Sequence, residues 1–372
     1  MKFTIDKNLL VKKLKFCNEI ILDLTTIPSL SGILIIVEEN KIILISSNQT
    51  TSCKIEINNN INIFSTGKIL IKGSLLFNII SKISENKITF NLIDNSIVRI
   101  STDKFTSDLN LLEDFTYPMI KFNHIGWKEF ILEKEFINKI YTKLTSTTLQ
   151  SFDQSNVLTG IYFNSERLEN FIEVTSTDSF HLSYLKHPYK GEKTTFILSL
   201  NDIKILNLII QESKNNINTY LNKNEILFQI EDITILSRVI DGQYPSITKI
   251  FNEKYNYSFL LNKKALFESI NRGIVLLNSD KKPILQLNIE KEKIITTFKN
   301  IESGSCYEDI EIKNYNGPEI KFYLNAKYLL DLIKNINSNE IEFNFINATS
   351  PIILKDLKDQ EFISLIVPRK NI

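Results

Sequence analysis

Apolar residues recur with helical spacing at six places along this 372-residue chain. Two series of helices are predicted, one beginning near Lys7, Lys134 and Lys263, the other near Gly73, Asn201 and Ala326. Starts within a series lie about 125 residues apart. A period of this length indicates repeated domains, because solenoid units span only about 20 to 50 residues. The pattern therefore predicts three repeats with two helices each.

Runs of alternating, β-branched residues separate the predicted helices, for example at 33–37, 41–45, 88–92 and 226–230. Such runs indicate antiparallel strands. The predicted fold class is α+β, with three repeated domains at 1–122, 123–251 and 252–372, each carrying two helices on one face of antiparallel sheets. The pairs Tyr117-Pro118 and Tyr244-Pro245, 127 positions apart, mark the ends of the first two repeats.

A helical wheel separates each predicted helix into an apolar and a cationic face. In the first helix Leu10, Leu14 and Cys17 fall on one side, with Lys12 and Lys15 opposite. All six helices are expected to expose a cation. The expected outward cations are Lys12, Lys15, Lys82, Lys139, Lys143, Lys204, Lys264, Arg272, Lys327 and Lys334.

Charge is distributed unevenly between the helices and the rest of the chain. Segments 6–20, 71–84, 133–146, 200–214, 262–277 and 325–337 hold 16 Lys and Arg against 8 Asp and Glu, an excess of +8. The whole chain carries +1, so the remainder carries −7. One interpretation is an ordinary solvated surface. The other is a polyanion approached along the helix side and repelled by the opposite side.

Helix dimensions limit how such faces could surround a polyanion. Helices packed ~8–10 Å apart would close a circle only about 18 Å across with six, and about 35 Å with twelve. Helix bodies of ~5 Å radius then leave roughly 25 Å clear in the larger circle. A B-form duplex is roughly 20 Å wide. Two copies of the chain could surround a duplex, whereas one could not.

Composition and motifs bound the remaining possibilities. Cys17, Cys53 and Cys306 are few and far apart, which favours a reducing compartment and no zinc cluster. The segment 1–7 is charged rather than apolar, and no apolar run approaches the ~18 residues of a membrane span. We therefore expect a cytoplasmic protein without membrane contact, cofactor or metal.

Catalysis is a competing hypothesis at one place. Asp178 could orient His181 in a hydrolase site, or it could bind backbone amides in a turn. The turn role is favoured, because no nucleophile elbow, P-loop or metal-spaced ligand set accompanies the pair. The acids Glu231-Asp232 are expected to be solvated at a strand end. A DNA-binding scaffold that forms no ring remains a further alternative.

Several segments resemble motifs of one known protein family. The start 1–5 is similar to the family's start, and Thr26-Ile27-Pro28 followed by a strand fits its first domain. Residues 176–182, Ser-Thr-Asp-Ser-Phe-His-Leu, resemble the family's Ala-Thr-Asp-Gly-His-Arg-Leu. Residues 241–245, Asp-Gly-Gln-Tyr-Pro, resemble its Asp-Gly-Arg-Phe-Pro, and 366–370 lie near its terminal Met-Pro-Met-Arg. With these motifs in this order, the chain resembles the β subunit of bacterial DNA polymerase III, the replicative sliding clamp.

The resemblance implies a non-catalytic processivity factor, a head-to-tail dimeric ring around duplex DNA of any sequence. Its partners would be the replicative polymerase's catalytic subunit, the clamp loader and other replication and repair proteins. These would dock a hydrophobic peptide in a pocket lined by Leu158, Thr177, Ser179, His181, Leu182, Pro245, Lys249, Ile250, Ile352, Val367, Pro368 and Arg369. The dimer contact would join Phe105 to Leu276 and Leu277 of the next subunit.

The chain departs from the family pattern at several of these positions. Ser179 and His181 replace the family's Gly and Arg, and Val367 and Arg369 replace its terminal Met residues. A less Met-rich, more basic pocket is expected. Leu24 stands where the family often has an Arg that touches DNA, so we expect that this chain does not touch DNA there.

Overall fold

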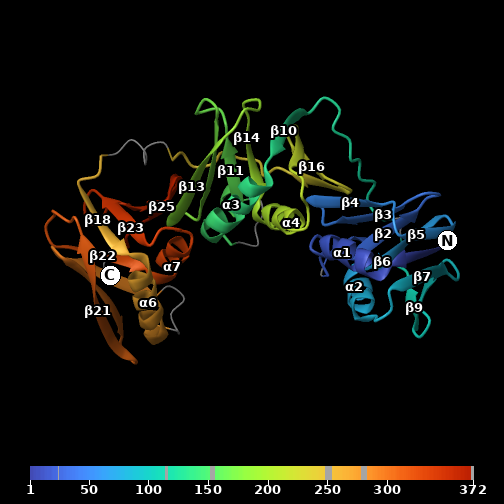
Figure 1. Ribbon diagram of the computed structural model, residues 1–372, viewed down its shortest axis with the longest axis horizontal. Helices are drawn as coiled ribbons and strands as arrows, with labels where there is room; N and C mark the ends of the chain where they lie inside the picture. The colour runs from blue at the N-terminus through green and yellow to red at the C-terminus, as the bar shows by residue number, and fades with distance from the viewer. Residues whose placement is uncertain (24, 114–115, 151–155, 248–253, 278–282, 370–372) are drawn as a thin grey trace. The chain divides into compact units, whose positions relative to one another are not determined.

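The computed structural model describes residues 1–372 apart from 24, 114–115, 151–155, 248–253, 278–282 and 370–372 (Figure 1). The chain divides into two compact units. Unit 1 comprises Met1–Ile137 and Asn201–Val239, and unit 2 comprises Asn138–Leu200 and Ile240–Ile372.

Six α-helices of nine or more residues lie within the described residues, and they begin at or within one residue of the predicted positions. They are α1 (Lys7–Asn18), α2 (Gly73–Lys82), α3 (Lys134–Leu144), α4 (Leu200–Ile210), α6 (Lys263–Ile274) and α7 (Ala326–Lys334). Short 3-10 helices are η1 (Pro28–Ser31), η2 (Thr145–Thr147), η3 (Val157–Thr159) and η4 (Val275–Leu277). The wheel interpretation of α1 is confirmed, since Leu10, Leu14 and Cys17 are buried.

Several helices begin without an intervening loop, because the last strand residue also caps the helix. Asp6 accepts a hydrogen bond from the Leu9 amide at the start of α1. Asn262 and Asn325 cap α6 and α7 in the same way. Short polar side chains at this position satisfy amides that the first helical turn leaves unpaired. The strand-to-helix junction therefore fixes where each helix starts.

Unit 1 contains two sheets, and every pairing recorded in them is antiparallel. One sheet has five strands in the order β5 (Ile61–Ser65), β1 (Lys2–Asp6), β7 (Lys87–Leu92), β8 (Ile97–Ser101) and β9 (Thr106–Asn110). The other has eight, in the order β10 (Lys128–Leu132), β15 (Ile217–Leu221), β16 (Glu225–Ile230), β17 (Ile233–Arg238), β4 (Thr51–Ile57), β3 (Ile42–Ser47), β2 (Gly32–Val37) and β6 (Gly67–Lys72). The β17–β4 pairing joins the second repeat to the first.

Unit 2 is built on twelve strands in one antiparallel sheet. Their order is β14 (Thr195–Ser199), β11 (Gly160–Asn164), β12 (Phe171–Thr177), β13 (His181–Pro188), β25 (Asp359–Ile366), β24 (Ile352–Asp356), β23 (Glu340–Phe345), β18 (Tyr257–Asn262), β21 (Gly304–Lys313), β20 (Lys293–Asn300), β19 (Ile284–Ile289) and β22 (Ile320–Asn325). The β13–β25 pairing joins the second repeat to the third.

The core of the first and third repeats contains the same kind of stacked aromatic pair. Phe3 on β1 stacks on Phe90 of β7 with ring centroids 4.8 Å apart, and Phe259 on β18 stacks on Phe343 of β23 at 4.9 Å. All four rings are buried. Cross-strand aromatic pairs of this kind stabilise a sheet beyond the area they bury. The predicted α+β class with antiparallel sheets is confirmed. None of the described helices is long and apolar enough to span a membrane.

Candidate functional site

The outward faces of four helices carry lysines that form no ion pair among the described residues. Lys12 on α1, Lys82 at the end of α2, Lys204 on α4 and Lys327 on α7 are all exposed. Lys15 on α1 is half-buried and likewise forms no ion pair within the described part of the chain. Exposed ammonium groups on a helix surface can meet phosphates without reading bases.

Other expected cations are exposed but have acidic partners on the same surface. Lys264 lies 3.7 Å from Glu268, and Lys334 lies 3.4 Å from Asp331. Arg272 pairs with Glu308 on β21, and this contact raises the pKa of the guanidinium. Exposed pairs of this type are worth little to stability and are screened by salt. They lower the local positive charge without removing it.

Lys143 departs from the expectation of an exposed cation. Its side chain is 6% exposed, its Nζ donates to the carbonyl of Asn335, and Nζ lies 3.7 Å from a carboxylate oxygen of Asp356. Burial lowers the pKa of Lys143, whereas attraction to Asp356 and Asp359 acts in the opposite direction. The prediction that Lys143 lies on an open face is wrong, because the end of α7 and β24 offer it better partners than solvent.

Lys139 is engaged at the same junction. Its Nζ lies 2.9 Å from Asp359, at the start of β25, and the Asp359 side chain is nearly buried. In unit 1, Lys13 on α1 forms a similar pair with Asp232, at 2.6 Å. The expectation that Asp232 is simply solvated is therefore wrong. Each of these lysines ties the first helix of a repeat to a hairpin of the following repeat.

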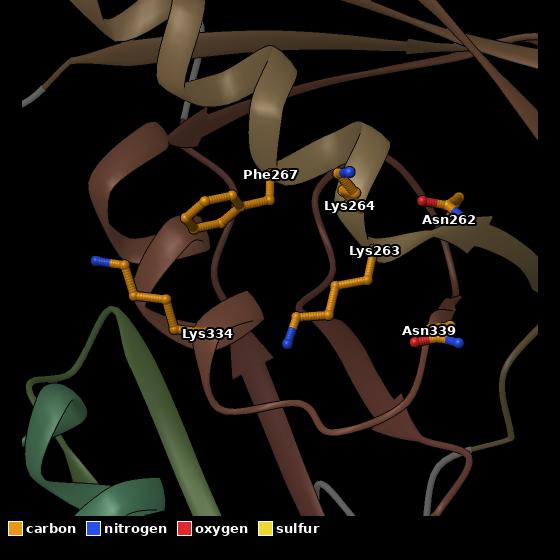
Figure 2. A pocket seen from close by; sticks show the side chains of 6 residues that line it. All are labelled: Asn262, Lys263, Lys264, Phe267, Lys334 and Asn339. Carbon is orange, nitrogen blue, oxygen red and sulfur yellow. The ribbon is translucent and has the colours of Figure 1, made fainter.

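A basic cavity of about 570 Å³ opens between the start of α6 and the end of α7 (Figure 2). Its lining combines three ammonium groups, two amides and one aromatic ring, from Asn262, Lys263, Lys264, Phe267, Lys334 and Asn339. Lys263 donates from Nζ to the carbonyl of Ile336. The cavity adds a concave positive region to the helix surface of unit 2.

The predicted peptide pocket centres on the tight turn between β12 and β13. Asp178 accepts hydrogen bonds from the amides of Phe180 and His181, each at 2.9 Å. Thr177 donates from its hydroxyl to the His181 carbonyl at 2.7 Å. Ser179 lies at φ 79°, a left-handed conformation that Gly adopts without steric cost. That conformation accounts for a Gly at this position in the resembling family.

His181 is buried at the base of this turn with 3% exposure. Its Nδ1 lies 2.7 Å from Asp178 and its Nε2 lies 3.2 Å from the Ser146 carbonyl, so both ring nitrogens face acceptors. The ring stacks on Tyr328 of α7 at 4.2 Å between centroids. Burial raises the pKa of Tyr328 to about 12, and Asp178 contributes in the same direction. The turn is thereby fastened to the third repeat.

The surroundings of Asp178 lower the pKa of its carboxyl group. Burial alone would raise its pKa, but the hydrogen bond and attraction of His181, with the amides of His181 and Phe180, hold the pKa below its usual value. The carboxylate thus has the turn role that the sequence favoured, because its Oδ1 accepts hydrogen bonds from the amides of Phe180 and His181. No group of three or more His, Cys, Asp or Glu that could hold a metal occurs in the part of the chain that the structure describes.

An apolar cluster lies beside the turn. Leu182, Tyr184, Ile353 and Leu365 are buried together, and Val367 packs against them while partly exposed. The segment after β25 follows the turn, since the Val367 amide donates to the Phe180 carbonyl at 2.9 Å and the Arg369 amide to the Tyr323 carbonyl at 2.7 Å. The structure thus brings the turn, the cluster and this segment together, and a peptide pocket at this place stays a prediction.

The other predicted pocket residues differ in exposure, and two of them are not described. Leu158 and Pro368 are half-exposed, Pro245 is exposed, and Ile352 is buried. Lys249 and Ile250 lie outside the described residues, as does Leu24. Two tyrosines that sequence reasoning missed, Tyr244 and Tyr328, complete the arrangement, the former accepting from the Thr177 amide at 3.1 Å. The Tyr244-Pro245 pair carried a signal for the first of them.

The residues predicted at the subunit contact differ in exposure. Phe105, before β9, and Leu276, in η4, are half-buried. Leu277 is only 2% exposed, whereas the neighbouring Val275 is 65% exposed. Leu277 therefore belongs to the core of the third repeat within one chain, and Val275 offers more surface to a neighbour.

Three models of one family together cover nearly the whole chain. They are the N-terminal domain of the DNA polymerase III beta subunit over residues 1–121, the central domain over 131–246 and the C-terminal domain over 248–370. The chain belongs to the DNA polymerase III β subunit family. The family is that of the sliding clamps, which serve replication as processivity factors rather than as catalysts.

Individual relatives agree over the full length. The chain is 25% identical to a beta sliding clamp of Staphylococcus epidermidis and 24% identical to one of Staphylococcus aureus, with 99% of both chains covered in each comparison. Among solved structures, the DNA polymerase III beta chain of Streptococcus pneumoniae matches with a TM-score of 0.93 at 24% identity, and that of Thermotoga maritima with 0.91 at 18%, both over 100% of each chain. These structures share the fold of three repeated domains.

Proposed function

We propose that two copies of this chain join head to tail into a ring that encircles duplex DNA and slides along it. The single observation that carries the proposal is the repeated junction. The second repeat pairs edge to edge with the first through β17 and β4, and with the third through β25 and β13. The strands at the equivalent outer positions, β9 and the first part of β21, have only one recorded neighbour each. A second copy would supply the missing neighbours.

The helix lysines support duplex DNA as the enclosed polymer. Lys12, Lys82, Lys204 and Lys327 extend from four helices of one chain, so a ring would present eight such lysines. Their charge would attract phosphates of any sequence, and the nearby acids would keep the attraction weak. The basic cavity at Lys264 and Lys334 would add to this surface. A ring held by topology needs only weak contacts and can therefore move along the duplex.

The arrangement around the β12–β13 turn supports a docking site for a short hydrophobic peptide. Leu182 and Leu365 provide an apolar floor, while Val367 and Arg369 line one edge. The partners that we propose are the replicative polymerase's catalytic subunit, the clamp loader, and other replication and repair proteins. We also propose domain boundaries at 1–122, 123–251 and 252–372, and a cytoplasmic location, where those partners act.

The decisive experiment measures retention on DNA. The purified chain of 43.1 kDa should run as a dimer of roughly twice that mass. After loading by a clamp loader it should remain on nicked circular DNA through gel filtration, and linearising the circle should release it. Equal retention on both forms, or a monomer that binds both alike, would overturn the proposal in favour of a scaffold.

A further inference from the structure

A cavity of about 700 Å³ lies within unit 1, where the first repeat meets the second. Its size is within the range of about 300–1,000 Å³ that is common for ligand pockets. The apolar part of its lining consists of Ile27, Leu30, Pro118, Met119, Ile120 and Leu236. Met119 is 90% exposed, so its side chain is accessible at the rim. The proposed ring and the proposed peptide pocket leave this cavity without a role.

The turn beside the cavity has the same geometry as the turn at the proposed peptide pocket. Between β3 and β4, Asn48 accepts hydrogen bonds through Oδ1 from the amides of Thr50 and Thr51, at 3.2 and 2.9 Å. Gln49 lies at φ 81°, and Ser179 in the other turn lies at φ 79°. In each turn a side-chain oxygen binds the amides two and three residues ahead, and the residue between adopts the left-handed conformation.

The sheet register shows which residues of the two junctions are equivalent. Ser52, the second residue of β4, pairs with Leu236 of β17. Leu182, the second residue of β13, pairs with Leu365 of β25. Leu236 therefore occupies at the first junction the position that Leu365 occupies at the second, and Ser52 occupies the position of Leu182.

The chain leaves the two sheets in the same way. The Arg238 amide donates to the Thr50 carbonyl at 2.9 Å, and the Val367 amide donates to the Phe180 carbonyl at 2.9 Å. Thr50 and Phe180 each directly precede the first residue of the strand on which the next repeat pairs. Arg238 is therefore the equivalent of Val367, which is one of the predicted pocket residues.

Two more predicted pocket residues have equivalents on the cavity wall. Leu30 lies two residues before the Gly that begins β2, and Leu158 lies two residues before the Gly that begins β11. Pro118 and Pro245 belong to the two Tyr-Pro pairs. Leu30 and Pro118 both line the cavity. The first junction thus repeats the arrangement that predicts a peptide pocket at the second, and it encloses a cavity at that place.

The chemistry of the first junction differs from that of the second. Arg238 and Lys121 on the cavity wall are exposed, and neither forms an ion pair with a described residue. The described lining includes one acid, Glu225, which is half-buried and lies opposite Arg238 in the register of β16 and β17. Two cations against one acid, together with an apolar floor, favour a ligand that combines an apolar side chain with carboxylates.

We propose that this cavity is a second docking site, which binds a short acidic peptide segment of a partner protein. One apolar side chain of the segment would lie against Leu30, Leu236 and Met119. A flanking carboxylate would meet Arg238 and Lys121. A peptide is favoured over single-stranded nucleic acid, because the described lining contains no aromatic ring on which a base could stack. The inference goes beyond the proposed function, since one chain could then hold two partners with different sequence preferences.

Methionine labelling tests the site in the intact protein, because Met1 and Met119 are the two methionines of the chain. With ¹³C in the methionine methyl groups, the peptide acetyl-Gly-Asp-Leu-Asp-Gly-amide should shift the Met119 resonance saturably and leave that of Met1 in place. Arg238→Glu should weaken the binding by about tenfold, because like charges then meet. The matched control Lys223→Glu changes an exposed lysine between β15 and β16 and should keep the wild-type affinity.

The charge-swapped peptide acetyl-Gly-Lys-Leu-Lys-Gly-amide should bind Arg238→Glu more tightly than it binds the wild type. A Met119 resonance that does not move, or that titrates identically in Arg238→Glu and the wild type, would overturn the site. A shift caused by oligo-dT and lost in Arg238→Glu would assign the cavity to nucleic acid and overturn the peptide. Val367→Lys, directed at the pocket of unit 2, should leave the Met119 titration unchanged, so failure of that pocket and failure of this site are distinguishable.

Discussion

Lys143 shows how one side chain can leave the surface that its helix presents. On a helical wheel it falls opposite the apolar stripe of α3, yet its ammonium group is buried against the last turn of α7. The carbonyls at a helix C-terminus carry partial negative charge, which favours a cation there. The ring of Phe362, with its centroid 4.6 Å from Nζ, adds a cation–π contact. These partners compensate for the loss of solvation.

Asp356 makes this burial tolerable. Its carboxylate accepts from the amides of Asn337 at 2.6 Å and Lys358 at 3.0 Å while lying 3.7 Å from Lys143. Burial alone would raise the pKa of Asp356, but these amides, Ser338 and Lys143 hold it below its usual value. A carboxyl group whose folded pKa is lowered stabilises the fold above its unfolded pKa and loses that effect as pH falls.

Asp356→Asn is expected to lower the free energy of unfolding by about 3 kcal/mol at pH 7, because Lys143 stays buried without its countercharge. The difference from the wild type should shrink as the pH falls below about 4, where the unfolded carboxyl group is protonated. Urea unfolding at pH 7 and pH 3 measures both. Asp241→Asn, at an exposed position, should change stability by less than about 0.5 kcal/mol. Equal loss at both pH values would contradict the account.

The proposed peptide pocket can be tested at Val367. Its side chain packs against the cluster of Leu182 and Leu365 while remaining partly exposed. Val367→Lys should weaken binding of a short hydrophobic peptide by about tenfold, because an ammonium group would have to be desolvated at the contact. Fluorescence anisotropy measures the affinity. Ile125→Lys, at an exposed position of unit 1, is the control, and equal affinities for both variants would refute the site.

At the scale of helices and strands, the features that could be predicted were those that depend on local sequence. Helix starts could be predicted because strand ends supply caps such as Asp6 and Asn262 directly before an amphipathic run. Burial of Leu10 and Leu14 followed from spacing alone. What could not be predicted was which outward residues find partners from distant segments. Lys139 and Lys143 are 220 and about 210 residues from Asp359 and Asp356, and periodicity holds no information about such contacts.

The contacts at the proposed pocket were likewise predictable only where they are local in sequence. Asp178 could be assigned a turn role, because Asp commonly binds amides two and three residues ahead. The stacking of Tyr328 on His181 could not, since it depends on how α7 packs against the second repeat. Resemblance supplied the pocket's outline, and the departures at Ser179 and His181 pointed to the positions where the turn has unusual backbone or new partners.

The helix faces make a prediction about salt. Replacing Lys12, Lys82, Lys204 and Lys327 by Ala should weaken binding to linear duplex DNA. The slope of log K against log salt should fall by roughly one unit for each phosphate that no longer meets an ammonium group. Each lysine is exposed with no ion pair among the described residues. Filter binding or anisotropy between low and physiological salt measures the slope.

The control for this set removes the same charge elsewhere. Four exposed lysines outside the helices serve the purpose, Lys87, Lys190, Lys223 and Lys321. Their replacement by Ala should leave the slope nearly unchanged, since net charge alone does not place an ammonium group beside a phosphate. If both quadruple variants reduce the slope equally, the helices do not face the duplex.

For the whole molecule, the subunit contact should depend on apolar surface as well as charge. Leu75, the third residue of α2, is 42% exposed. The third residues of α4 and α7, Asp202 and Tyr328, instead contact the neighbouring repeat within the chain, through Thr51 and His181. At the unit 1 junction the polar partners are Thr51 and Ser237, whose hydroxyls donate to Asp202 at 2.7 Å each. A carboxylate is acceptable there because donors surround it.

Leu75→Asp is therefore expected to separate the dimer while leaving the chain folded. An Asp is compatible with the third position of a helix, because α4 has Asp202 there. A carboxylate in the first turn also interacts favourably with the helix dipole. At the subunit contact the sheet register offers it no such hydroxyls, because Leu109 stands where the second repeat has Ser237. Burying an unpaired carboxylate costs about 3 kcal/mol, or roughly 100-fold in association.

Sedimentation of Leu75→Asp should show a monomer. Its melting temperature should be unchanged, and it should not be retained on circular DNA. The control Ile93→Asp, at an exposed turn of the same repeat, should remain dimeric. A dimeric Leu75→Asp would mean that α2 lies away from the contact.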